Sequence, residues 1–165
     1  MKKLFLITAI TTSFFTFSQS KTAHINYNEL LQSMPEMAIA KSTLEEFTKT
    51  YQEQLNKMQE DYKVKSENFK KEEATIQPAM KSLKVKELQD LEASFLKFKD
   101  DAQLEINNKE KDLLAPILKK AKDAVEVVVK EKKYNYVIDS GAGQYVYLDP
   151  NENIMLQVKN KLGIK

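Results

Sequence analysis

The sequence predicts an α+β protein that is mostly α: a long antiparallel helical hairpin (a coiled coil) projecting from a small β body. Two long segments of the 165-residue chain carry apolar residues at steps of three and four, the spacing of one helix face. Only three Gly and four Pro interrupt the chain, which is few for a loop-rich all-β fold. Short β-rich stretches lie on both sides of this helical region, and one domain is expected at this length.

Composition excludes most enzyme classes. The chain has no Cys and one His, which rules out a disulfide framework, a cysteine zinc site, a thiol nucleophile and a two-His mechanism. The turn Gly141-Ala142-Gly143 has Val146 where a nucleotide-binding loop needs its third Gly. We therefore predict that the protein is not an enzyme and needs no cofactor or metal.

Residues 1–20 are typical of a secretory signal peptide. Lys2 and Lys3 precede an uncharged, largely apolar run, and small residues then allow cleavage near Ser18 or Ser20. The run is too short for an ordinary transmembrane helix of ~20 apolar residues, so stable membrane insertion is not predicted. An uncleaved anchor is the alternative. The expected location is the periplasm, although the signal peptide alone would also allow full secretion.

The mature chain is formally neutral. All 26 basic residues are Lys, and removing Lys2 and Lys3 leaves 24 Lys against 24 acidic residues. The positive charge of the whole chain belongs to the signal peptide, so nucleic-acid binding is not predicted.

Residues 21–35 are expected to form the first part of the body. Ala23–Tyr27 alternates in the manner of a half-buried strand, with His24 and Asn26 on the polar face. Residues 28–31 suggest a helical turn. Ser33-Met34-Pro35-Glu36 then predicts a helix start, with Ser33 as the cap and Pro35 in the first turn.

Residues 36–133 predict the helical hairpin. Its tip is expected near 76–80, because Pro78 disfavours helix in the residue before it. Arms of ~40 residues extend for roughly 60 Å at 1.5 Å per residue. The first stripe is Met37, Ala40, Leu44, Phe47, Tyr51, Leu55, Met58, Tyr62 and Phe69; the second is Leu88, Leu91, Phe95, Phe98, Ala102, Ile106, Leu113, Ile117, Ala121, Ala124 and Val128.

Pro116 lies inside the second predicted helix. A Pro in a helix interior removes one backbone donor, so a kink and a hinge between body and arms are predicted there.

Residues 134–165 are expected to complete the body. Tyr134–Ile138 and Gln144–Leu148 are rich in β-formers, and the turn between them predicts a hairpin. The segment Asp149-Pro150-Asn151-Glu152-Asn153 is expected to cap a final helix over Ile154–Leu162 that stops at Gly163. So few strands leave open edges, which predicts oligomerisation through the strand-bearing ends. The candidate residues are Ile25, Tyr27, Tyr136, Ile138, Tyr145 and Tyr147.

Several strings resemble the Skp/OmpH family of periplasmic chaperones, and the resemblance covers essentially the whole mature chain. The most specific parts are the Met-Pro-Glu helix start and the Asp-Pro before the last helix. The matching strings are Ala23-His24-Ile25-Asn26-Tyr27, Leu30-Leu31-Gln32-Ser33-Met34-Pro35-Glu36, Leu113-Leu114-Ala115-Pro116-Ile117, Tyr134-Asn135-Tyr136-Val137-Ile138-Asp139 and Leu148-Asp149-Pro150.

The resemblance implies a homotrimer whose strands form a small β-barrel and whose helical tentacles enclose a cavity. It implies ATP-independent holding of unfolded outer-membrane proteins on their way to the outer membrane. Some family members are strongly basic, whereas this mature chain is neutral and lacks Arg. Lipopolysaccharide binding is therefore not carried over from the family.

The candidate client-binding residues are apolar side chains that lie off the main stripes, namely Val64, Val85, Leu96 and Leu104. The last three fall within an arc of about 100° on the second helix. Isolated exposed apolar residues are also ordinary on protein surfaces. The alternative functions are a structural coiled-coil scaffold of the cell envelope and a membrane-surface amphipathic protein; the neutral charge and narrow stripe disfavour the second.

Overall fold

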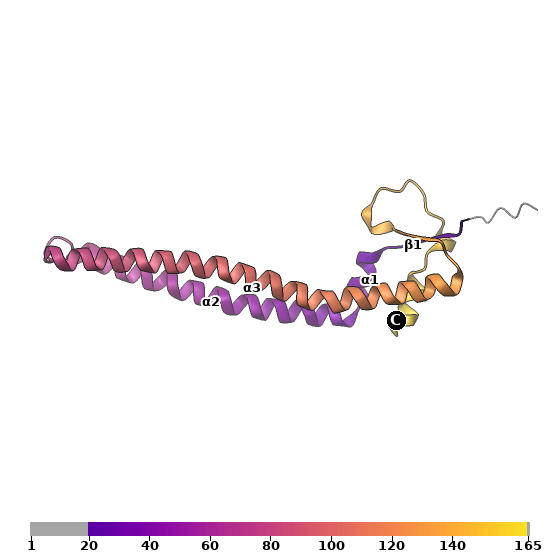
Figure 1. The fold of residues 1–165 in the computed structure, drawn as a ribbon, viewed down its shortest axis with the longest axis horizontal. Helices are drawn as coiled ribbons and strands as arrows, with labels where there is room; N and C mark the ends of the chain where they lie inside the picture. Colours follow the sequence, from indigo (N-terminus) through magenta and orange to yellow (C-terminus); the bar gives the residue numbers. More distant parts are fainter. Residues whose placement is uncertain (1–19, 165) are drawn as a thin grey trace, which may run out of the picture.

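The computed structural model describes residues 20–164, and the predicted signal peptide lies outside these residues except for Ser20. Figure 1 shows a long pair of helices that extends from a small body at one end. The two long helices are α2 (Pro35–Glu72) and α3 (Pro78–Lys132). The predicted fold class is confirmed, because a helical hairpin projects from a small body that contains a sheet.

The arm is held together by a narrow apolar seam between α2 and α3. Tyr51 lies between two rings, 5.1 Å from the centroid of Phe47 on its own helix and 5.8 Å from Phe98 on α3. The 38 residues of α2 and the 55 residues of α3 have lengths of about 57 and 83 Å at 1.5 Å per residue. The extra length of α3 continues past the start of α2 into the body.

The buried core lies in the body rather than in the arm. It forms where α3 meets α1 (Tyr27–Ser33) and α4 (Met155–Leu162). Leu30, Ala121, Ile154 and Val158 are fully inaccessible to solvent. The arm side chains, by contrast, remain partly or fully exposed, apart from Ala102 and those near the body. The body therefore carries the hydrophobic stabilisation of a single chain.

The sheet has two strands, and its topology differs from the prediction. β1 (Thr22–Ile25) pairs in parallel with β2 (Tyr136–Asp139), and His24 lies opposite Ile138. The predicted hairpin between Tyr134–Ile138 and Gln144–Leu148 is wrong, because residues 143–149 form no strand in the structure. Tyr27 is also not a strand residue, since it begins α1.

Two hydrogen bonds to the Asp139 side chain, one local and one from the distant Tyr27, explain why the chain does not turn back after β2. The Asp139 carboxylate accepts hydrogen bonds from the backbone N–H groups of Gly141, at 2.9 Å, and Tyr27, at 3.1 Å. This caps a 3₁₀ turn, η1 (Ser140–Ala142), and the chain then passes Gly143 at a φ of 71°. The long α2–α3 excursion between β1 and β2 supplies the crossover that a parallel pair requires.

β1 also has a neighbour on its other side. The N–H of Ile154 donates to the carbonyl of His24 at 3.0 Å, and His24 forms an isolated bridge with Asn153. This segment pairs with the second edge of β1, and the chain just before it meets the His24 side chain, whose Nε2 lies 2.9 Å from the Asp149 carbonyl, so His24 is buried. The prediction of an outward-facing His24 is wrong for this reason.

The helix ends follow the sequence only in part. Gly163 ends α4 at a φ of 71°, as predicted, but Asp149 caps a separate 3₁₀ turn, η2 (Pro150–Glu152). The side chain of Asn153 instead accepts from the N–H of Met155 at the start of α4. Ser33 does not cap α2, because its hydroxyl donates to the carbonyl of Leu30 at 2.7 Å.

α3 continues without a break through Pro116 (Figure 1). A kink large enough to end the helix is therefore absent at this residue, and the hinge role of Pro116 stays a prediction.

Candidate functional site

The functional candidates are surfaces rather than a chemical centre. Within residues 20–164, no group of three or more His, Cys, Asp or Glu side chains is placed to hold a metal ion. Over the same span, none of the helices combines the length and the apolar character that a bilayer crossing requires. Two surfaces remain: exposed apolar side chains on the arm, and the open side of the body.

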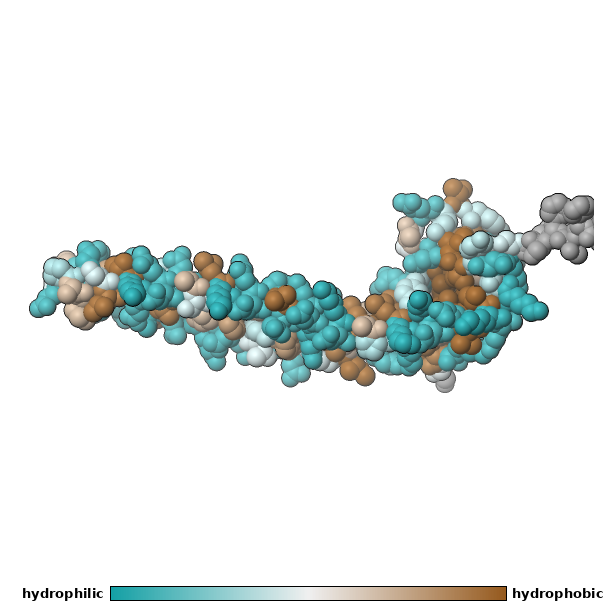
Figure 2. Space-filling view, in the orientation of Figure 1, coloured by the Kyte–Doolittle hydropathy of each residue, from teal (hydrophilic) through white to brown (hydrophobic). Residues whose placement is uncertain are grey.

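The four predicted client-binding residues are all exposed on the arm. Solvent reaches 46% of Val64, 36% of Val85, 54% of Leu96 and 59% of Leu104. The structure does not gather them into one patch, since Val85 and Leu104 are 19 positions, or about 28 Å, apart along α3. Figure 2 shows isolated hydrophobic residues of this kind along a largely hydrophilic arm. Such spacing suits many weak contacts with a long chain better than one deep pocket.

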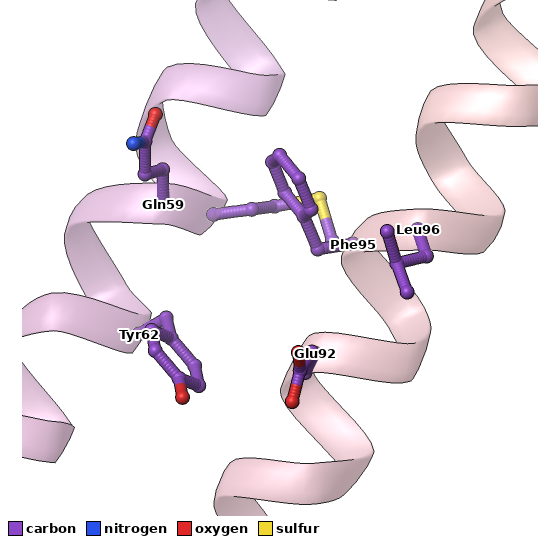
Figure 3. A pocket seen from close by; sticks show the side chains of 6 residues that line it. Gln59, Tyr62, Glu92, Phe95 and Leu96 are labelled. Atoms are coloured by element: carbon purple, nitrogen blue, oxygen red, sulfur yellow. The ribbon is translucent and has the colours of Figure 1, made fainter.

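Leu96 lines a groove between α2 and α3 in the middle of the arm. Met58, Gln59 and Tyr62 line it from α2, and Glu92, Phe95 and Leu96 line it from α3. In Figure 3, Tyr62 and Glu92 extend toward the same space between the two helices. The groove has a volume of about 250 Å³ and is open to solvent along the arm. Three apolar side chains and Tyr62, bordered by an amide and a carboxylate, form a surface that accepts varied apolar groups.

A second groove lies at the root of the arm and includes Pro116. Ile39, Leu113 and Ile117 supply its apolar walls, and an ion pair between Glu36 and Lys120 borders it. The hydrogen bond from Lys120 lowers the pKa of the Glu36 carboxyl below its ordinary value. Farther out on the arm, Lys65 hydrogen-bonds Glu87 and lowers the pKa of that carboxyl in the same way.

The open side of the body carries three of the predicted oligomerisation residues as exposed aromatic side chains. Tyr136 on β2, and Tyr145 and Tyr147 in the following loop, are all exposed. Ile138 is half-buried. Ile25 is 2% exposed and packs inside the core of its own chain, so it is unavailable to a partner.

Two hydrogen bonds join the segment Asp149–Glu152, which follows the loop after β2, to the rest of the body. The Tyr134 hydroxyl donates to the Glu152 carboxylate at 2.7 Å, which raises the pKa of Tyr134 to about 12. The His24 ring Nε2 lies 2.9 Å from the Asp149 carbonyl, an arrangement in which the ring nitrogen donates. His24 thus acts as a buried structural residue.

Sequence reasoning missed exposed apolar side chains near the arm root and tip, among them Leu83 and Leu118, which are each more than one third exposed. Leu118 follows the buried stripe residue Ile117 as Leu96 follows Phe95, so helical position was sufficient to find it. Ile39 is exposed as well, and the sequence already indicates that it points away from the stripe of its helix.

The architecture defines the class: a body with one long helical-hairpin arm, whose accessible features are apolar contact surfaces. The chain belongs to the OmpH-like outer membrane protein family, whose model matches residues 21–162. The resemblance drawn from the sequence strings is therefore confirmed.

Relatives and a solved structure agree with this assignment. The chain is 26% identical over 141 residues to the chaperone protein Skp of Photorhabdus laumondii subsp. laumondii, covering 84% of this chain and 86% of the relative. The same identity and coverage hold for the chaperone protein Skp of Photorhabdus luminescens. The fold matches a crystal structure of an OmpH-like protein from Caulobacter crescentus with a TM-score of 0.74 at 13% identity, over 86% of this chain and 82% of that one. The family is one of chaperones rather than enzymes.

Proposed function

We propose that the chain is an ATP-independent periplasmic holdase that keeps unfolded outer-membrane proteins from aggregating in transit to the outer membrane. The observation that carries this proposal is the exposure of Leu96 and Leu104, with Val64 and Val85, along an arm that has almost no buried core. Isolated exposed apolar residues are ordinary on protein surfaces, but a series of them along an arm with little core of its own suits many weak contacts with a client.

The assembly proposed for this function is a homotrimer that encloses a cavity between its arms. Among residues 20–164, β2 has a neighbouring strand on only one side, so its other edge is open. Tyr136 belongs to β2, and Tyr145 and Tyr147 follow it in the chain; all three are exposed. An open strand edge with exposed aromatic residues is a surface that a second copy of the chain can pair with. Three copies would place three arms around one space.

The assembly has a direct test. Multi-angle light scattering of the mature chain from Lys21 should give the mass of three protomers. The double substitution Tyr145→Ser, Tyr147→Ser should lower that mass, while Val127→Ser, an exposed change on α3, should leave it unchanged. A wild-type chain that stays monomeric at all concentrations would remove the cavity from the proposal.

The function is tested by diluting a urea-unfolded outer-membrane barrel protein into buffer without ATP and recording light scattering. Suppression that saturates near one trimer per client supports holding. Unchanged aggregation in the presence of a well-folded helical oligomer would contradict it and favour the alternative of a coiled-coil scaffold of the envelope. In the holdase proposal, release comes from client folding or hand-over, because many weak contacts exchange quickly one at a time.

A further inference from the structure

One flank of the arm carries side-chain amides at helical spacing. Gln52 and Asn56 on α2 form a hydrogen bond of 2.9 Å, and Gln103 and Asn107 on α3 form one of 3.0 Å. All four side chains are exposed. Together with Gln59 they are named the amide ladder below.

Helix geometry places the ladder on the same flank as the groove at Leu96. Gln59 and Leu96 line that groove together from the two helices. Gln52 precedes Gln59 by seven residues and Gln103 follows Leu96 by seven, and seven residues return to within about 20° of the same direction. Because the helices are antiparallel, both steps lead toward the body, by about 10 Å each. The two amide pairs therefore continue the groove along one side of the arm.

The ladder lies between the ion pairs that join the two helices. In the described part of the chain, Lys65 with Glu87 and Lys84 with Glu72 lie on its tip side, and Lys120 with Glu36 lies on its root side. The charges within one turn of Leu96 on α3 are Glu92, Lys97, Lys99 and Asp100, two of each sign. Net charge therefore gives this stretch little means of selecting a ligand.

Each amide pair still has hydrogen-bonding capacity. The pair uses one N–H of the Gln and the oxygen of the Asn, which leaves the Gln oxygen as an acceptor and the Asn NH₂ group as a donor. Within each pair the two amide groups are in contact, so the free acceptor and the free donor lie side by side. An extended chain likewise presents the N–H and the C=O of one residue on the same edge, and this unit repeats every two residues, at about 6.7 Å.

We propose that the amide ladder binds the main chain of an extended, unfolded polypeptide, while the neighbouring groove takes its apolar side chains. The inference rests on the proposed holding function and adds what part of the client is recognised. A backbone N–H and C=O occur at nearly every residue of every client, so amides aimed at them bind without regard to sequence. Apolar side chains alone would favour only the most hydrophobic segments.

The experiment compares two triple variants of equal composition. The ladder variant is Gln59→Met, Asn56→Leu, Asn107→Leu, which removes the groove amide and one partner of each pair. The control variant is Gln54→Met, Asn68→Leu, Asn108→Leu, at exposed positions 100–180° away from the ladder residues of the same helix by the 100° step. Both variants add the same apolar surface. If the ladder binds the main chain, the ladder variant should bind an unfolded peptide more weakly than wild type; if only apolar contacts matter, it should bind equally or more tightly.

The probe is a fluorescein-labelled neutral peptide of Ser, Val, Gly and Thr, read by fluorescence polarisation against the full mature chain. The ladder variant should bind it about fivefold more weakly than wild type, from the loss of roughly one net hydrogen bond. The control variant should stay within about twofold. The wild-type chain should also bind an N-methylated copy of the peptide about fivefold more weakly, since methylation removes backbone donors.

Equal or tighter binding by the ladder variant would overturn the inference, and so would undiminished binding of the N-methylated peptide. The comparison with the N-methylated peptide uses only the wild-type chain. It therefore tests the inference even if the ladder variant folds poorly. The results distinguish a failure of the amide-ladder inference from a failure of the proposed holdase function. Wild-type suppression of barrel-protein aggregation together with an unaffected ladder variant keeps the holdase and removes the ladder. A wild-type chain that neither suppresses aggregation nor binds the peptide removes both.

Discussion

The hydroxyl of Tyr27 donates a hydrogen bond of 3.0 Å to the backbone carbonyl of Leu118. Tyr27 is the first residue of α1, and Leu118 lies two residues after Pro116 on α3. The bond fastens a helix of the body to the long arm helix just on the body side of the proline. Burial, followed by the neighbouring Asp139 carboxylate, raises the pKa of the Tyr27 hydroxyl. It therefore remains a donor at neutral pH.

Removing this hydroxyl should loosen the junction between arm and body. Tyr27→Phe keeps the ring and deletes the hydrogen bond, and we expect a loss of about 1 kcal/mol in the free energy of unfolding. Urea titration followed by circular dichroism at fixed protomer concentration measures it, because oligomerisation makes stability depend on concentration. Tyr62→Phe, on the middle arm, is the control. A Tyr27→Phe midpoint equal to that of wild type would show that the bond contributes nothing.

Pro116 is predicted to act as the hinge of the arm. The prolyl nitrogen carries no hydrogen, so the carbonyl of Asp112 has no i+4 donor in the helix. Pro116→Ala restores that donor and should narrow the spread of arm positions seen by small-angle X-ray scattering. Ala115→Gly, next to it on the same helix, should widen the spread. The hinge prediction is wrong if Pro116→Ala and wild type give the same distribution.

The exposed apolar residues of the arm should decide client affinity. Changing Val64, Val85, Leu96 and Leu104 together to Ser removes apolar surface while leaving the body core intact. We expect client binding to weaken about tenfold or more, at roughly 25 cal/mol for each Å² of apolar area that the client no longer covers. Oligomer mass and helicity should not change.

The control for that variant is Val127→Ser with Leu156→Ser, both exposed on or near the body. Client affinity is measured by polarisation with a labelled unfolded barrel protein. If the fourfold Ser variant binds as well as wild type, these residues are not part of the client surface.

Acid should weaken the two ion pairs that join α2 and α3 through Glu36 and Glu87. The pKa values of Glu36 and Glu87 are lowered by hydrogen bonds from Lys120 and Lys65. A carboxyl whose folded-state pKa is lowered stabilises the fold above its ordinary value of 4.5, and that contribution disappears as the pH falls through the lowered value. Urea midpoints between neutral pH and pH values below 4.5 should fall less steeply for Glu36→Gln, Glu87→Gln than for wild type.

Salt provides the check on this prediction. The two ion pairs are exposed, so high ionic strength should shrink the difference between variant and wild type. Parallel acid profiles for the two proteins at low salt would contradict the assigned role of these pairs.

Local sequence was sufficient for the hairpin because its determinants are local. The stripe from Met37 to Phe69 repeats at helical steps, and Pro35 and Pro78 stand in the first turn of α2 and α3. Each helix is specified by residues within a few turns of one another. The apolar periodicity and the Pro residues at the helix starts therefore predict both helices and the turn between them. The exposed positions of Val64, Val85, Leu96 and Leu104 followed from the same periodicity.

The body was harder to predict because its determinants are distant in sequence. β1 pairs with β2 across more than a hundred residues, and Asp139 binds the N–H of Tyr27 over a separation of 112. β-Formers in Gln144–Leu148 favoured a local hairpin. No local pattern indicates that the Asp139 side chain accepts a hydrogen bond from the first residue of α1. Long-range pairing overrides strand propensity in such a case.

The sequence by itself thus determined a helical arm, its exposed apolar residues and the equal number of Lys and acidic residues from Lys21 onward. Only the tertiary structure decided that the strands are parallel, that His24 is buried and that Ile25 belongs to the core of its own chain. It also decided which amides share a flank with the groove at Leu96. Helices are set by contacts three and four residues apart, whereas strand partners and shared surfaces depend on which distant segments the folded core brings together.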